Sequence, residues 1–283
     1  MAGETTITTL AGLQDILLAQ SVAKFQTRST LFNAVYTQAA QNETTVRFNT
    51  EAVPYTAALQ ATEGGAVAIE AVTIGAQDAT LGTYPSLATV SKLSWPSPGA
   101  VNSVTNTLAG KLARTTDTLL TKLFTSASFS SASLSSSLSA SITLDYILDA
   151  SAHLDAEGYI GEKILVLHPK SWIKVAKEIL SLAGGSYNVG AEILRTGYIA
   201  SVAGISIYVS PWVGTVLAAG ATYAYNNLMF IREAIGLGYR DPLIDITWAP
   251  NLRYNTMDVL GVSYQVVKVL TANAGTRLED TTS

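Results

Sequence analysis

The sequence predicts an α+β protein, and three segments carry this prediction. Residues 104–123 repeat their apolar side chains at helical spacing. Residues 257–270 are rich in β-branched side chains, which favours a strand. Residues 44–95 are rich in Thr, Val, Ala and Gly and also read as strands. With 48% hydrophobic residues among 283, the chain is long and apolar enough to bury a sizeable core.

The charge content is low for a protein of this size. Charged residues make up 13% of the chain, whereas an ordinary soluble domain carries roughly 25%. An isolated globule needs charged surface to stay dispersed. The shortage of charge therefore predicts that other molecules cover much of the surface. The formal net charge of −4 argues against a general nucleic-acid coat.

Membrane and disulfide classes are also disfavoured. No stretch approaches the roughly 18 to 20 uninterrupted apolar residues of a membrane-spanning helix. The opening MAGETTITTL has neither the basic segment nor the apolar segment of a signal peptide. We therefore expect a soluble, intracellular protein without a membrane partner. The absence of cysteine removes disulfides, thiolate metal sites and cysteine nucleophiles.

The N-terminal part predicts a helix and then a long, thin β-excursion. Three leucines share one side of residues 10–27: Leu10, Leu13 and Leu17. In residues 44–95, TTVRFNTEAVPYTA and GAVAIEAVTIG read as strands, with a turn at Glu63, Gly64 and Gly65. The excursion holds few large apolar side chains and cannot bury a core alone. We expect it to become ordered by packing on a partner.

A long helix of about twenty residues should follow the excursion. Pro96, Pro98 and Gly99 close the excursion, and Ser103 is expected to cap the helix. Its apolar side consists of Leu108, Leu112, Leu119 and Leu123, with Leu120 beside them. Another side carries a basic stripe within about a quarter turn: Lys111, Arg114 and Lys122. Such a stripe is either a plain solvated face or a contact surface for an anion.

The remaining chain alternates helices and strands. Ten serines in residues 126–141 predict a surface loop or weak strand. Thr143 should cap a helix that ends at Gly158. The apolar strand at residues 164–167 is followed by His168 and Pro169, and an amphipathic helix begins at the proline. The buried face of that helix is expected to comprise Trp172, Val175, Ala176 and Ile179. Further strands are expected at residues 205–210, 223–239 and 257–270.

No constellation of residues predicts catalysis. His168 as a catalytic base would need an orienting acid and a nucleophile, and no G-x-S-x-G elbow surrounds any serine. A histidine at a strand end before proline is more often a hydrogen-bonded junction residue. His153 has no partner at metal-ligand spacing, and the glycines of residues 184–190 lack a G-K-[ST] ending. We predict no enzyme activity, no cofactor and no metal, with a serine hydrolase using His168 as a distant alternative.

The order of these segments resembles a family. The phrases ILVLHPKSWIKV, GYIASVAGISIYVSP, NNLMFIREAIGLGYR and VSYQVVKVL are similar to those of major capsid proteins of tailed bacteriophages, which have the Hong Kong 97-type capsid fold. The resemblance implies an N-terminal arm (residues 1–44), an extended β-hairpin loop (45–95), a peripheral domain with a long spine helix (96–125 and 246–283) and an axial domain (126–245). In this family the loop lies across a neighbouring subunit.

The same resemblance implies a function and partners. The expected function is a virion shell protein that self-assembles as hexamer and pentamer capsomers into an icosahedral shell around double-stranded DNA. Assembly would take place in the host cytoplasm with portal and scaffolding proteins, and a cement protein could decorate the outside. The basic stripe would face the packaged DNA without sequence preference. An encapsulin-type nanocompartment shell of the same fold is the alternative.

Overall fold

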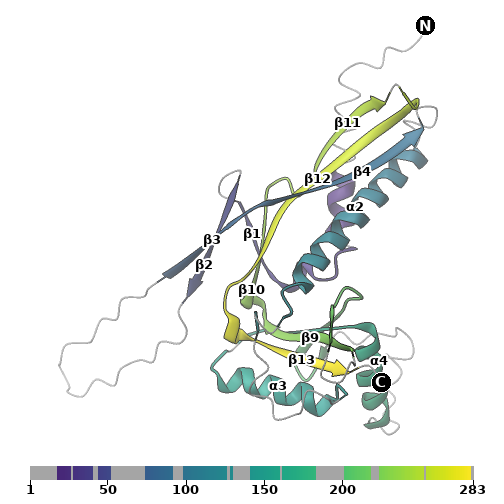
Figure 1. Cartoon of the computed structure of the whole chain (residues 1–283). Coiled ribbons are helices and arrows are strands. Elements are labelled where there is room, and N and C mark those ends of the chain that lie inside the picture. Colours follow the sequence, from purple (N-terminus) through teal and green to yellow (C-terminus); the bar gives the residue numbers. More distant parts are fainter. Residues whose placement is uncertain are drawn as a thin grey trace, which may run out of the picture.

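The computed structural model describes residues 18–26, 28–40, 44–51, 74–91, 98–125, 128–129, 141–159, 161–182, 201–217, 223–251 and 253–281. These residues form two sheets that follow one another along an elongated body, and a two-stranded ribbon that projects from it (Figure 1). One long helix packs along the first sheet, and two shorter helices pack on the second.

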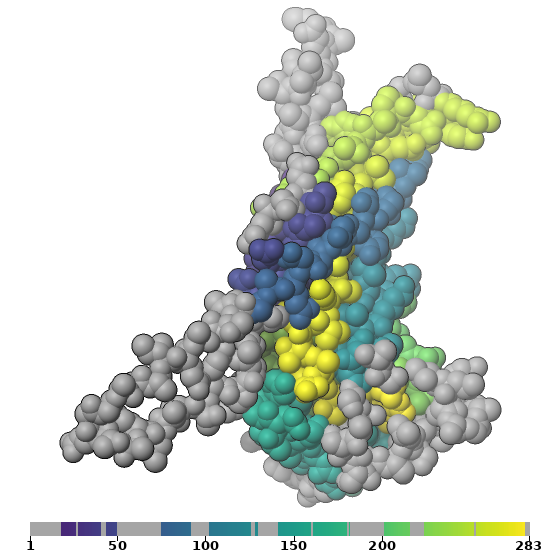
Figure 2. All heavy atoms as spheres, turned by 60° about the vertical axis from the view of Figure 1, so that its left-hand side comes forward, coloured from purple at the N-terminus to yellow at the C-terminus, as the bar shows by residue number. Residues whose placement is uncertain are grey.

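The first sheet is built around the long strand β12 (Thr256–Val269). Strands β10 (Ile235–Tyr239) and β11 (Asp245–Asn251) pair antiparallel with successive parts of one edge, and β4 (Gly82–Ser91) pairs antiparallel along the other. Strand β1 (Tyr36–Ala39) extends the sheet parallel to β10. Figure 2 shows β12 in yellow alongside β4 in blue, with the long helix in teal next to them. The predicted strand at residues 257–270 is therefore confirmed.

Helix α2 (Pro98–Thr121) packs along β4 and β12. Leu108, Leu112 and Leu120 are buried on its apolar side, as the spacing predicts, whereas Leu119 and Leu123 are half-buried. The expected cap at Ser103 is wrong because the helix begins at Pro98, where a missing N–H and a fixed φ suit the first turn. Ser103 lies inside the helix, and its carbonyl accepts the hydroxyl of Thr107 at 2.9 Å.

The second sheet is built around β9 (Tyr223–Ile231). Strand β13 (Gly275–Thr281) pairs antiparallel with one edge of β9, and β5 (Lys163–Leu167) and β8 (Thr215–Leu217) pair with the other. Strand β7 (Ile205–Val209) lies parallel to β5, and β6 (Ser201–Val202) ends the sheet. The strands predicted from residue 164 and from residue 205 are both confirmed.

Two helices cover one face of the second sheet. Helix α3 (Leu144–Ala156) begins where the hydroxyl of Thr143 accepts the amide of Tyr146 at 3.2 Å, as predicted. It ends at Ala156, two residues before Gly158, which has φ of +83° and lets the Tyr159 amide reach the Leu154 carbonyl at 3.1 Å. Helix α4 (Pro169–Leu182) buries most of its predicted face in the same core: Trp172, Val175 and Ile179.

Two direct strand-to-strand connections join the sheets, in addition to the passage from β4 through α2 and α3 to β5. The first runs from β9 through the 3-10 turn η2 (Arg232–Ala234) to β10, and the second runs from β12 through η3 (Ala272–Ala274) to β13. The Ala234 carbonyl accepts the amide of Leu270 at 2.8 Å, so the two segments are bonded to each other. The last strand, β13, thus belongs to the second sheet, so residues 246–283, expected as part of the peripheral domain, contribute strands to both sheets.

The ribbon consists of β2 (Thr45–Glu51) and β3 (Ile74–Thr80), paired antiparallel. Its base is docked on the body because Val46 and Phe48 are fully buried against Gly238 and Gly236 of β10. The two glycines leave no spare room. A Cβ on Gly236 would lie 2.7 Å from Cε1 of Phe48, and one on Gly238 would lie 2.8 Å from Cγ2 of Val46.

The expected loop of residues 45–95 is thus divided in two. Residues 45–51 and 74–80 form the ribbon, and β4 leaves it at Gly82 to run along β12 inside the first sheet. Hydrogen bonding to β12 over ten residue pairs makes β4 part of the body rather than of a thin excursion. The predicted turn at Glu63, Gly64 and Gly65 lies outside the described residues, as do Leu10, Leu13 and Leu17.

Candidate functional site: the basic side of α2

The three cations of the predicted stripe are exposed. Lys111 and Arg114 lie on α2, whereas Lys122 lies in the turn after the helix ends at Thr121. Lys122 follows Arg114 by eight residues, which is roughly 12 Å along a helix axis. Lys111 and Arg114 are therefore near neighbours, and Lys122 is set apart from them.

Lys111 and Arg114 are held by uncharged partners. Nζ of Lys111 donates to the carbonyl of Leu87 in β4 at 3.1 Å. The guanidinium of Arg114 lies over the indole ring of Trp212, with Cζ 4.0 Å from the ring centroid. A carbonyl or an aromatic ring fixes the position of a cation without cancelling its charge.

A third cation, Arg28, joins them from the N-terminal helix. Residues 18–26 are helical, as predicted, and bury Phe25 fully in the core. Nη1 of Arg28 donates to the Asn106 carbonyl at 2.7 Å, and Nη2 lies 3.2 Å from Oδ1 of the same residue. Arg28, Lys111 and Arg114 line one hollow of about 510 Å³ together with Trp212. Sequence reasoning missed Arg28 and Trp212, because Arg28 lies 78 residues from Asn106 and Trp212 lies 98 residues from Arg114, and neither carries a local signal.

The hollow contains one acid, Asp117, which is 3% exposed. Its two oxygens accept four hydrogen bonds from a single segment: the Ser29 hydroxyl, the Thr30 amide and hydroxyl, and the Leu31 amide, at 2.7 to 3.2 Å. This carboxylate therefore fastens residues 29–31 to α2. Within the described part of the chain, no ion pair joins Asp117 to the three cations.

His168 is a junction residue in the structure, as we interpreted it. Its amide donates to Oδ1 of Asn227 at 2.8 Å, and its Nδ1 accepts the amide of Lys170 at 3.2 Å. The imidazole stacks on Tyr225 with ring centroids 3.7 Å apart. Burial lowers the pKa of His168, the charge of Lys170 lowers it further, and Asp280 partly opposes both. The ring is therefore used for packing and for starting α4.

The serine next to this junction is also committed to structure. The hydroxyl of Ser171 donates to the buried carboxylate of Asp280 at 2.6 Å, and Nδ2 of Asn227 donates to the Ser171 oxygen at 3.2 Å. Lys174 donates to the other oxygen of Asp280 at 2.7 Å, and the Ile142 amide donates to that oxygen at 3.1 Å. The network ties β13 to α4 and to the residues before α3.

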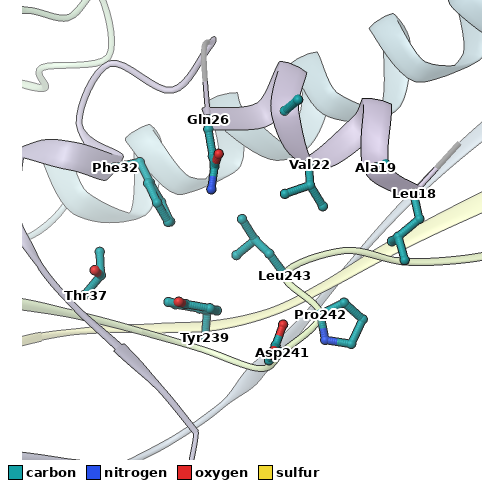
Figure 3. A pocket seen from close by; sticks show the side chains of 11 residues that line it. Leu18, Ala19, Val22, Gln26, Phe32, Thr37, Tyr239, Asp241, Pro242 and Leu243 are labelled. Carbon is teal, nitrogen blue, oxygen red and sulfur yellow. The ribbon is translucent and has the colours of Figure 1, made fainter. Parts of the chain in front are cut away.

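A second hollow, also about 510 Å³, lies between the N-terminal helix and the segment after β10 (Figure 3). Leu18 and Val22 reach into it from the helix, and Tyr239, Pro242 and Leu243 form the opposite wall. Its lining is mainly apolar, so it offers packing rather than a set of converging charges. Over the described ranges, no group of three or more His, Cys, Asp or Glu side chains could hold a metal ion. None of the described helices is long and apolar enough to cross a membrane.

Comparison of the sequence with family models and with curated proteins gives no match. Solved structures, in contrast, match over most of the chain. The capsid of Ralstonia phage GP4 matches with a TM-score of 0.60 at 11% identity, covering 88% of this chain and 87% of that chain. The capsid of cyanophage P-SCSP1u gives 0.58 at 13% identity, with coverages of 87% and 86%. A virus-like particle from Pyrococcus furiosus gives 0.56 at 10% identity, with coverages of 93% and 98%.

The likeness extends through both sheets rather than a single motif, since each match spans more than four fifths of both chains. Identities of 10 to 13% establish the fold and not a shared sequence family. The chain has the Hong Kong 97-type fold of phage major capsid subunits.

Proposed function

We propose that this chain is a major capsid protein that self-assembles into the icosahedral shell of a tailed phage around double-stranded DNA. The observation that carries the proposal is the match of the fold to the capsids of two phages over 87 to 88% of the chain. A structural role also agrees with the charge content of 13%, because a shell subunit buries most of its flanks against copies of itself. We expect hexamer and pentamer capsomers and no enzyme activity.

The division of the chain into regions is part of this proposal. We assign the spine helix to α2, and the peripheral domain to the first sheet, which includes β4 and β10 as well as β12. The axial domain would comprise the second sheet with α3 and α4, including β13. The β2–β3 ribbon would be the base of the extended loop that reaches a neighbouring subunit, with its contact region around Glu63, Gly64 and Gly65.

Assembly tests the proposal directly. We expect the purified chain, alone or with a scaffolding protein, to form closed shells of uniform size in negative-stain electron microscopy. Their contents separate the two shell functions. Genomic DNA inside particles from infected cells supports a capsid, and an enclosed enzyme supports an encapsulin-type nanocompartment. A subunit that stays monomeric at high concentration under all assembly conditions contradicts both.

The extended loop offers a sharper test because its base is fixed on the body. Deleting residues 54–71 and closing the gap with a short turn keeps β2, β3 and the contact of Phe48 with Gly236. We expect the variant to fold with an unchanged circular dichroism spectrum and to form no shells. The intact chain, prepared in parallel, is the control. Normal shells from the shortened chain contradict a role of the loop as an intersubunit strap.

The basic side of α2 is proposed to face the interior and the packaged DNA. Its three stripe cations, Lys111, Arg114 and Lys122, are exposed, so they can contact phosphates without sequence preference. Reversing all three charges should spare empty shells and reduce DNA packaging. We place the mature protein in the virion and its assembly in the host cytoplasm, with portal and scaffolding proteins as partners and a cement protein on the outside of the shell.

A further inference from the structure

The hollow beside α2 combines residues from three separate parts of the chain. Arg28 comes from the N-terminal helix, Lys111 and Arg114 come from α2, and Trp212 comes from the turn after β7. A basic stripe on one helix can be an ordinary solvated face. Convergence of three cations from two helices, with an aromatic ring under one of them, requires the tertiary fold and is a more specific arrangement.

Each of the three cations is positioned without being neutralised. Their partners are the Asn106 carbonyl, the Leu87 carbonyl and the Trp212 ring, all of which are uncharged. Among the described residues, no carboxylate forms an ion pair with any of the three. Arg28, Lys111 and Arg114 therefore keep their positive charge, together with N–H donors that the fold does not use.

Gly110 makes room for Arg28. A glycine inside a long helix costs about 1 kcal/mol relative to alanine, so its position in the middle of α2 calls for a local reason. A Cβ on Gly110 would lie 2.7 Å from Nη1 of Arg28. The missing side chain thus allows the guanidinium to lie against the backbone of α2 and donate to the Asn106 carbonyl.

The remaining hydrogen-bonding capacity suits a phosphate. Guanidinium groups bind phosphate oxygens through paired N–H donors, and an ammonium group adds a compact charge. The ring of Trp212 holds the Arg114 guanidinium in place, which reduces the freedom lost on binding. Asp117 lines the same hollow but already accepts four hydrogen bonds from residues 29–31, so it is not free to compete for the cations.

We propose that this hollow is a phosphate-binding subsite for the backbone of double-stranded DNA, with Arg28, Lys111 and Arg114 as its donors. The proposal rests on the proposed shell function and deepens it. The proposed site is formed by several parts of the chain rather than by one face of α2. It includes Arg28 and Trp212 and does not include Lys122. Binding is independent of DNA sequence and weakens as salt increases.

The test measures the affinity of the unassembled full chain for a fluorescein-labelled DNA duplex by anisotropy at several salt concentrations. Arg28→Ala should weaken binding roughly tenfold and lower the salt slope by about one, because one phosphate contact is lost. Gly110→Ala changes no charge and should weaken binding in the same direction by displacing Arg28. Lys177→Ala, which removes an exposed cation on α4, is the matched control and should leave the affinity unchanged.

The outcomes separate the subsite from general charge. Equal weakening by Arg28→Ala and Lys177→Ala, or an unchanged affinity in Gly110→Ala, overturns the proposal. So does tighter binding of an acidic polyglutamate peptide than of the duplex. Thermal unfolding of each variant checks the fold, and Gly110→Ala remains informative if Arg28→Ala fails to fold because the alanine suits a helix.

Electron microscopy of the same variants tests shell formation separately from DNA binding. Shells that form normally from all variants while DNA affinity stays unchanged overturn the subsite and leave the shell function standing. Absence of shells from the intact chain under all assembly conditions, with and without a scaffolding protein, overturns the shell function, whatever the DNA affinity.

Discussion

The contact between the β2–β3 ribbon and the body can be tested by one methyl group. In Gly236→Ala, the new Cβ would lie 2.7 Å from Cε1 and 2.9 Å from Cδ1 of Phe48, closer than carbon atoms approach without repulsion. Gly236 has no positive φ and lies in the strand β10, so its backbone accepts alanine without strain. The steric conflict with Phe48 is therefore the dominant effect of the substitution.

The magnitude follows from packing. Phe48 is fully buried, and forcing one extra carbon against a close-packed ring costs about 1–3 kcal/mol. Phe48→Ala alone should cost about 3–5 kcal/mol, because it leaves a cavity. In the Phe48→Ala background the methyl group of Gly236→Ala enters that cavity. Its cost should then disappear or become a gain of about 0.4–1 kcal/mol from the stiffer unfolded chain.

Urea unfolding of unassembled subunits measures the four free energies of this double-mutant cycle. We expect an interaction energy of at least about 1 kcal/mol between the two sites. Thr247→Ala, an exposed position in β11, serves as the control and should show no coupling to Phe48. Additive costs of the two substitutions would mean that the ribbon does not dock on β10 through Phe48 and would refute the reasoning.

Three further predictions address other parts of the chain. Asp280→Ala should lower the free energy of unfolding by about 3 kcal/mol in urea titrations, since it removes a buried acceptor from Lys174 and from the Ile142 amide; an effect below 1 kcal/mol would contradict this. Burial lowers the pKa of folded His168, so its contribution to stability is present above about pH 6.5 and is lost as pH falls through the lowered pKa. Between pH 7 and pH 5, His168→Gln should therefore show a smaller fall in Tm than the intact chain, and an equal fall would argue against it. The chain has no lysine from Phe25 through Ser91, and Lys92 lies at the base of the 45–95 loop, so the body of the loop lacks an amine for covalent cross-links. Boiled particles should therefore give one band near 29.8 kDa on a detergent gel rather than a ladder.

Sequence reasoning succeeded where the signal is local. The apolar spacing of α2, the Thr143 cap, the end of α3 before Gly158 and the passage from β5 through His168 to α4 each depend on a few neighbouring residues. The helix was expected to follow a cap at Ser103, whereas it begins six residues earlier than that cap implies, at Pro98, because a proline suits the first helical turn.

The failures concern contacts between distant segments. The partner of β4 is β12, more than 160 residues further along the chain, and the residues of β4 contain nothing that specifies it. The departure of β13 from the first sheet depends on the η3 turn, which has no strong breaker residue. Arg28 reaches α2 across 78 residues, so the stripe was recognised by its period on one helix and the hollow was not.

The two segments between the sheets have a mechanical consequence. They lie side by side, each with a short 3-10 turn, and a hydrogen bond from Leu270 to the Ala234 carbonyl joins them. Two connections that are hydrogen-bonded to each other resist rotation of one sheet relative to the other about the long axis of the molecule, because that rotation would break the bond between Leu270 and Ala234. Bending across the pair requires only small changes at the turns. We therefore expect bending across this pair to be easier than rotation about it, so that neighbours that meet at different angles could be accommodated while both cores stay intact.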